Sequence, residues 1–293
     1  MLKSFSSFLS EDMGLDLGTA NTLVYVKGKG IILNEPSVVA IATDNKNNKS
    51  VLAVGGDAKS MLGRTPGRIE AIRPMKDGVI ADFDIAEAMI KHFIKKVHKK
   101  SFFANPNIVI CVPSGATNVE RRAIKESAET AGAKKVYLIE EPVAAAIGAG
   151  LPISEPSGSM VVDIGGGTTD LAIFKDGIIR HTSVIPFGGN VITDDIKEGC
   201  SIIEKQAELL KIKFGSAWPG ENRENEIVSI PGLRGRDPKE ITLKNLSKII
   251  HARVVEIIEQ VYIEIKNYGH EEQKKKLIAG IVLTGGGSQL KHL

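Results

Sequence analysis

Three glycine-rich turns, each next to a short apolar run, carry the residues of this chain that could bind phosphate. The first holds Asp16, Gly18, Thr19, Ala20 and Asn21, the second Asp163, Gly165, Gly166, Gly167 and Thr168, and the third Gly285, Gly286, Gly287 and Ser288. Glycine at the end of a strand lets several backbone N–H groups approach one phosphate. A single turn of this kind more often serves a hairpin, so the prediction depends on there being three.

The first two turns share one arrangement, in which an aspartate stands two residues before a glycine and a threonine follows. This repetition is expected of two similar half-domains that face each other across a cleft. Carboxylates at the strand ends would then hold Mg²⁺ and water, while glycine and threonine groups hold phosphate. The other interpretation is an aspartate that only caps its own turn.

The elements that must position these residues follow from apolar periodicity and from punctuating residues. Strands and a hairpin are expected over 15–41, and an exposed loop over 43–50 precedes a strand at 51–54. Helices are expected over 85–97, with Asp84 as N-cap, and over 118–131, each followed by a strand, at 108–112 and 136–139. The apolar stripe over 241–262 predicts a pair of packed helices.

Glu141 lies where the last of these strands meets a helix that begins with Pro142. Proline is tolerated at the first helical position because its missing N–H would have no partner there. An acid at this junction can simply complement the helix dipole, or it can face a bound ligand.

Four segments of the first half resemble the MreB family of bacterial actins. They read LDLGTANT at 15–22, LNEPSVVA at 33–40, RPMKDGVIADF at 73–83 and EEPVAAAIG at 140–148. In the second half, RHT at 180–182, VIPFGGN at 184–190 and IPGLRGR at 230–236 look more like the FtsA family of actin-like division proteins. The segment GNVITDDI at 189–196 departs from MreB, in which a Gly-Asp pair and a longer helical insert are expected, so the chain reads as a composite.

Both resemblances imply an α/β protein with the actin-like ATPase fold, in which two ribonuclease H-like domains surround a nucleotide cleft. Domain I would span 1–145 with a small subdomain at about 33–80, and domain II would span 146–293 with one at about 190–255. The families continue into a further helix and strand, so the fold is expected to be truncated at its C-terminus.

The resemblance also implies a role for each candidate residue. Asp16 would hold Mg²⁺ through water, Asp163 would help to polarise the lytic water, and Glu141, with Glu140 as the alternative, would orient that water. Thr19, Ala20 and Asn21 would wrap the β- and γ-phosphates from one side, and the second turn from the other. The cofactors implied are ATP and Mg²⁺, although nothing in the sequence excludes GTP.

The adenosine end of the nucleotide would lie against Glu208, Lys211 and the third glycine turn, whose backbone could lie flat against adenine. Glu208 and Lys211 are three residues apart in a helical stretch, so they can face one ligand or form a surface ion pair of little energetic worth.

Composition agrees with a soluble cytoplasmic protein of two domains. The 293 residues are 42% hydrophobic and 25% charged, with a net charge of +3, which argues against a dedicated nucleic-acid binder. Cys111 and Cys200 have neither metal-ligand nor disulfide-framework spacing. No stretch approaches the ~18 apolar residues of a membrane-spanning helix.

Two apolar segments could nevertheless bind a membrane surface. Leu2, Phe5, Phe8 and Leu9 fall on one face of a short helical pattern, which suits an interfacial anchor or a terminus docked on its own domain. Phe102 and Phe103 lie in a loop that, by the MreB resemblance, inserts into membrane. Polymerisation would multiply such weak anchors.

The function that the resemblance implies is a cytoskeletal ATPase that forms membrane-associated filaments of itself on the inner face of the cytoplasmic membrane. Slow ATP hydrolysis would act as a timer, and the filaments would direct cell-wall synthesis and cell shape. One alternative is an FtsA-like protein that tethers the division ring to membrane. Another is a small-molecule kinase of the same superfamily, but we find neither a sugar-binding insert nor a phosphotransfer base.

Overall fold

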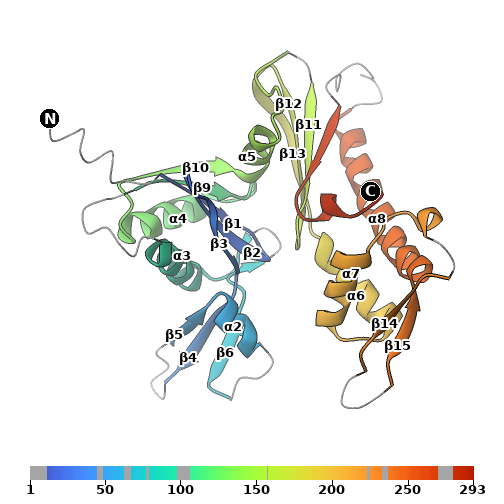
Figure 1. Ribbon diagram of the computed structural model, residues 1–293. Helices are drawn as coiled ribbons and strands as arrows, with labels where there is room; N and C mark the ends of the chain where they lie inside the picture. Colours follow the sequence, from blue (N-terminus) through green and yellow to red (C-terminus); the bar gives the residue numbers. More distant parts are fainter. Residues whose placement is uncertain are drawn as a thin grey trace. The chain divides into compact units, whose positions relative to one another are not determined.

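The computed structural model describes residues 12–44, 49–62, 67–76, 79–97, 106–156, 158–222, 225–232, 237–269 and 280–293 (Figure 1). The chain divides into two compact units, residues 1–144 and 145–293, and each is described by itself.

Unit 1 is built on a five-stranded sheet with the strand order β10-β9-β1-β2-β3. Its strands are β1 (Met13–Leu17), β2 (Asn21–Val26), β3 (Gly30–Pro36), β9 (Asn107–Val112) and β10 (Lys135–Glu140). β1, β9 and β10 run parallel, whereas β2 and β3 form antiparallel hairpins with their neighbours. The carboxyl ends of the three parallel strands therefore lie at one edge of the sheet, where the first glycine turn begins.

Helices α3 (Phe83–Val97) and α4 (Asn118–Thr130) follow, and α5 (Glu141–Gly148) continues directly from β10. Phe93 and Met89 of α3 belong to one buried cluster with Leu15 and Ile110 of the sheet, which fixes α3 on the sheet. The expected N-cap at Asp84 is wrong, because the Asp82 carboxylate accepts the backbone N–H of Ile85 at 3.1 Å and α3 begins at Phe83.

A smaller sheet of unit 1 has the strand order β5-β4-β6. It consists of β4 (Val39–Thr43), β5 (Lys49–Val54) and β6 (Ile69–Ile72), with α2 (Gly56–Met61) and the strand pair β7 (Met75–Lys76) and β8 (Val79–Ile80) nearby in sequence. Val38, Ala40 and Ala58 form its compact core. The small side chains let α2 pack closely on the sheet.

Unit 2 contains a four-stranded sheet with the order β13-β12-β11-β16. Its strands are β11 (Ser159–Ile164), β12 (Thr169–Lys175), β13 (Ile178–Ile185) and β16 (Ile281–Thr284). β11 pairs in parallel with β16 and antiparallel with β12, so the second and third glycine turns leave neighbouring strands at the same edge.

The remainder of unit 2 comprises α6 (Gly189–Cys200), α7 (Glu204–Phe214), the 3₁₀ turns η1 (Pro219–Glu221) and η4 (Gly287–Gln289), the hairpin β14 (Ile227–Ile230) and β15 (Lys239–Thr242), and α8 (Leu243–Asn267). The predicted helix pair is wrong, because α8 is one continuous helix that Thr242 caps at its start. Leu246 and Ile250 pack on α6 and α7, whereas Val261 and Ile265 pack on the sheet. One long apolar stripe therefore serves two cores.

Candidate functional site

The first glycine turn joins β1 to β2, and Ser37 supports it through two hydrogen bonds. The Ser37 hydroxyl donates to the Gly18 carbonyl at 2.6 Å, and the Ser37 backbone N–H donates to the Ala20 carbonyl at 3.0 Å. The Thr22 hydroxyl lies 2.9 Å from that of Ser37, and both side chains are fully buried. A Cβ at Gly18 would lie 2.6 Å from the Asn21 carbonyl oxygen, so this tight turn needs glycine.

Asp16 and Glu141 of unit 1 lie at the same edge of the sheet. Asp16 is opposite Cys111 of β9, which is in turn opposite Ile139 of β10, and Glu141 follows two residues after Ile139. Two strand spacings separate β1 from β10, which is about 10 Å. The turn at 18–20 and the first residue of α5 are thus positioned by one rigid row of backbone hydrogen bonds.

Glu140 has a structural partner of its own. Arg121 of α4 donates from Nη2 to Glu140 Oε1 at 3.0 Å and from Nε to the Ala116 carbonyl at 3.1 Å. The arginine thereby fixes the end of β10 against the start of α4. Glu140 therefore has a structural role at the junction of β10 and α4.

The second glycine turn joins β11 to β12 in unit 2 and repeats the design of the first. Asp163, like Asp16, is the penultimate residue of its strand. The Gly165 N–H donates to the Thr168 carbonyl at 2.9 Å, which closes the turn. Asp163 lies opposite Asp170 on β12 and Thr284 on β16.

Asp170 supports this turn from within the sheet. The Thr168 hydroxyl donates to Asp170 Oδ2 at 2.7 Å, and Asp170 is only 6% exposed. Burial raises the pKa of Asp170 above its usual value, and the Thr168 hydrogen bond only partly offsets this. The buried carboxylate holds Thr168 in one orientation at a cost in desolvation.

The first turn of α6 docks on the second glycine turn. The Gly189 N–H donates to the Gly165 carbonyl at 2.9 Å, and the Asn190 N–H donates to the Gly166 carbonyl at 2.8 Å. A Cβ at Gly188 would lie 2.5 Å from the Gly165 carbonyl oxygen, which excludes a side chain there. The segment 189–196 thus begins at the support of the second glycine turn.

The third glycine turn packs against Asp163 and Ile164. Gly285 has φ +82°, and a Cβ there would lie 2.2 Å from Asp163 Oδ1, while a Cβ at Gly287 would lie 2.3 Å from Ile164 Cγ2. A Cβ at Gly286 would meet nothing within 4 Å. Ser288 turns back on its own backbone and donates to the Gly285 carbonyl at 2.8 Å. Packing against Asp163 and Ile164 therefore requires glycine at positions 285 and 287, whereas Gly286 faces open space.

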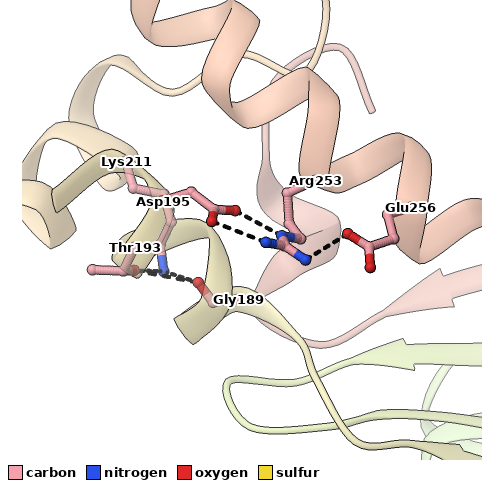
Figure 2. A network of polar contacts seen from close by, with 6 residues as sticks. All are labelled: Gly189, Thr193, Asp195, Lys211, Arg253 and Glu256. Carbon is pink, nitrogen blue, oxygen red and sulfur yellow. Dashed lines mark hydrogen bonds and ion pairs between the residues drawn. The ribbon is translucent and has the colours of Figure 1, made fainter. Parts of the chain in front are cut away.

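Glu208 and Lys211 of α7 form an ion pair at 2.8 Å beside the start of α6. The Lys211 ammonium also donates to the Gly189 carbonyl at 2.8 Å and to the Thr193 hydroxyl at 2.7 Å (Figure 2). On the opposite side of α6, Asp195 accepts two hydrogen bonds from Arg253 of α8, which also contacts Glu256 (Figure 2). α7 thus holds the start of α6 at Gly189, and α8 holds its middle at Asp195.

The predicted residues therefore gather separately within each unit. Unit 1 brings Asp16, the first turn and Glu141 to one sheet edge, and unit 2 brings Asp163, the second and third turns and the α7 pair together. The predicted membrane residues Leu2, Phe5, Phe8, Leu9, Phe102 and Phe103 lie outside the described residues.

Sequence reasoning missed three supporting residues, Ser37, Asp170 and Gly188. Two signals were available in the sequence. Asp170 stands two residues after Thr168 of the second turn, and Gly188 is the first glycine of the Gly-Gly pair in VIPFGGN. Ser37 lies in the quoted segment LNEPSVVA, but nothing there points to its partner Gly18, which is nineteen residues away in sequence.

The described part of the chain contains no cluster of three or more His, Cys, Asp or Glu residues that could hold a metal ion, and its two cysteines form no disulfide. None of its helices is both long and apolar enough to span a bilayer.

Known proteins match this chain over nearly its whole length. The family model of the MreB/Mbl protein matches residues 10–293. The cell shape-determining protein MreB of Escherichia coli K12 is 51% identical over all of this chain and 87% of its own length. The crystal structure of MreB5 of Spiroplasma citri bound to AMPPNP matches with a TM-score of 0.79 and 34% identity, covering 96% of this chain and 86% of that one.

The MamK double helical filament, 20% identical, has the same fold with a TM-score of 0.72 over 96% of this chain and 87% of that one. Because the family match includes the second half, the composite interpretation and the FtsA-like and kinase alternatives are not favoured. The chain has the actin-like α/β fold and belongs to the MreB/Mbl family.

Proposed function

We propose that this protein is an actin-like cytoskeletal protein of cell-shape determination, which binds ATP with Mg²⁺, polymerises and hydrolyses the nucleotide slowly. The observation that carries the proposal is the repeated design of the two glycine turns, each following a strand whose penultimate residue is an aspartate. One such turn has many structural explanations, whereas the same turn in each unit is explained by a ligand with several phosphates.

Binding would depend on backbone N–H groups of the turns at 18–21 and 165–168. Their supports, Ser37 in unit 1 and Asp170 with the start of α6 in unit 2, hold the turns in shape before ligand arrives. Such preorganisation reduces the entropy lost on binding. The structure of MreB5 with AMPPNP, an ATP analogue, supports nucleotide as the ligand class.

The residues present fit Mg²⁺ that arrives with the nucleotide. Asp16 is one carboxylate at the edge of the turn, and Mg²⁺ commonly uses one or two carboxylates together with water and substrate phosphates. The described residues offer no larger carboxylate cluster. We therefore propose that Mg²⁺ binds together with the nucleotide phosphates and not to protein ligands alone. Bound Mg²⁺ would neutralise phosphate charge.

Hydrolysis would depend on Glu141, which orients the attacking water, and on Asp163, which polarises it. Glu141 lies in the first turn of α5, while the neighbouring Glu140 is paired with Arg121. Slow hydrolysis would set the lifetime of the filament.

Filament formation, attachment to the inner membrane face and guidance of cell-wall synthesis extend the proposal to partners. The cell shape-determining name of the MreB relative and the filament of MamK, which has the same fold, support self-assembly. The apolar residues Leu2, Phe5, Phe8, Leu9, Phe102 and Phe103 are the proposed membrane contacts.

Calorimetric titration of the purified chain with ATP tests the nucleotide claim, with Mg²⁺ and with EDTA. We expect saturable binding that weakens at least several-fold in EDTA and in the variant Asp16→Asn. Asp57→Asn, on the exposed face of α2, is the matched control and should bind as wild type does. No binding by the folded wild-type chain would refute the proposal.

A further inference from the structure

Unit 2 contains a cavity of about 430 Å³ between the end of α6, strand β15 and the first turns of α8. Its lining comprises residues 199–200 of α6, residues 239–242 of β15, and Lys244, Asn245 and Lys248 of α8. A volume of this size is typical of sites for small molecules. None of these residues belongs to the glycine turns or to the ion pair of α7, so the cavity is separate from the candidate nucleotide site.

Positive charge dominates the lining of this cavity. Lys239, Lys244 and Lys248 each contribute +1 and Glu240 contributes −1, so the net charge of the lining is +2 near neutral pH. Lys244 and Lys248 are four residues apart on α8, a spacing at which like charges repel each other. Neither Lys239 nor Lys248 forms an ion pair with another described residue. An anion bound between the lysines would relieve their repulsion.

Two buried, uncharged side chains, those of Cys200 and Ile241, form the inner wall of the cavity. Burial raises the pKa of the Cys200 thiol, and the positive charge of Lys239 partly offsets this effect. The electric field of Lys239 therefore reaches the inner wall. The Thr242 hydroxyl accepts the Asn245 N–H at 3.2 Å and can still donate its own proton to a ligand. The cavity thus combines positive charge with a hydrogen-bond donor.

We propose that this cavity binds a small anion with several negative charges, of the diphosphate class. Each ammonium group adds its own attraction, so three lysines around one cavity favour a compact, multiply charged ligand over a monoanion. Lysine binds phosphate as a point charge, without the two-pronged geometry that arginine imposes. The inference goes beyond the proposed function and does not depend on it, because the cavity shares no residue with the candidate nucleotide site.

The test is a backbone-amide NMR titration of the full chain with sodium pyrophosphate, in buffer without Mg²⁺ or nucleotide. We expect saturable shifts of the amide signals of residues 199–200 and 239–248, and no saturable shifts there with sodium acetate, a monoanion. Shifts confined to residues 165–168 and 285–288 would place pyrophosphate in the glycine turns and overturn this inference while supporting the proposed function. The absence of saturable shifts at the cavity, or equal affinity for acetate, would also overturn it.

Charge variants of the cavity make the test specific. Lys239→Gln and Lys248→Gln should each weaken pyrophosphate binding about two- to fivefold, a typical size for one exposed charge, and Glu240→Gln should strengthen it. Lys125→Gln, which removes one positive charge from α4 of unit 1, is the matched control and should bind as wild type does. All four side chains are exposed, so these variants should fold normally. Equal weakening in Lys125→Gln, or unchanged binding in both cavity lysine variants, would overturn the inference.

Discussion

Arg121 donates a hydrogen bond to Glu140 across 3.0 Å and so ties the last residue of β10 to α4, one residue before the glutamate that begins α5. Glu140 has a defined structural partner in unit 1, and Glu141 is assigned the proposed role beside the attacking water.

The role proposed for Glu141, which Glu140 does not share, predicts different effects of two neighbouring substitutions. Glu141→Gln should lower steady-state ATP turnover about 100-fold, a typical size for loss of a group that orients or deprotonates water, with ATP binding retained. Glu140→Gln is the matched control, and its turnover should stay within a few-fold of wild type. Equal loss in both variants would remove the distinction between the two carboxylates.

Gly285 should tolerate no side chain. Gly285→Ala places a Cβ against Asp163 and Ile164 at φ +82°, so the free energy of unfolding should fall by about 1–3 kcal/mol. Gly286→Ala, at an open position, should change it by less than about 0.5 kcal/mol. Urea unfolding monitored by circular dichroism measures both, and equal stability of the two variants would contradict the described packing of the third turn.

Ser37 should stabilise the first turn although it contacts no ligand. Ser37→Ala removes the hydrogen bond to the Gly18 carbonyl and leaves the buried Thr22 hydroxyl without this partner, so we expect a loss of about 1–3 kcal/mol in unfolding free energy. Ser60→Ala, which removes an exposed hydroxyl on α2 that also bonds a carbonyl, is the control and should cost less than about 0.5 kcal/mol. ATP affinity should fall only in Ser37→Ala.

Asp170 should make stability depend on pH in a defined direction. Burial raises the pKa of Asp170 above its usual 3.8, so the folded chain holds this proton more tightly than the unfolded chain does. Stability from this group is therefore lost as pH rises from the unfolded pKa through the folded one. Asp170→Asn should remove that loss. The unfolding free energy of Asp170→Asn minus that of the wild type should therefore increase with pH above about 4 and then level off. An advantage that is the same at all pH values would contradict the buried, titrating carboxylate.

The glycine turns were predictable from sequence because their chemistry is local. In each turn the apolar run, the aspartate and the glycine are close together in the sequence. The structure places Asp16 and Asp163 at equivalent positions, each as the penultimate residue of its strand. The supports were not predictable, because Ser37 reaches Gly18 and Lys211 reaches Gly189 only after strands and helices have packed.

The two wrong predictions of elements have similar causes. Asp82 and Asp84 are both acceptable N-caps, and only the backbone geometry shows that Asp82 accepts the Ile85 N–H. The apolar stripe beginning at Leu246 changes partner from α6 and α7 to the sheet without a break in the helix. Sequence periodicity records that a residue is buried, not against which element.

The most direct test of the proposed function is electron microscopy of the purified chain on liposomes, together with sedimentation, with Mg·ATP and without nucleotide. We predict filaments on the membrane and protein in the membrane pellet only with Mg·ATP. Glu141→Gln should form filaments that persist longer, because the nucleotide would remain unhydrolysed. A folded, ATP-binding chain that forms no filaments under either condition would contradict the cytoskeletal account.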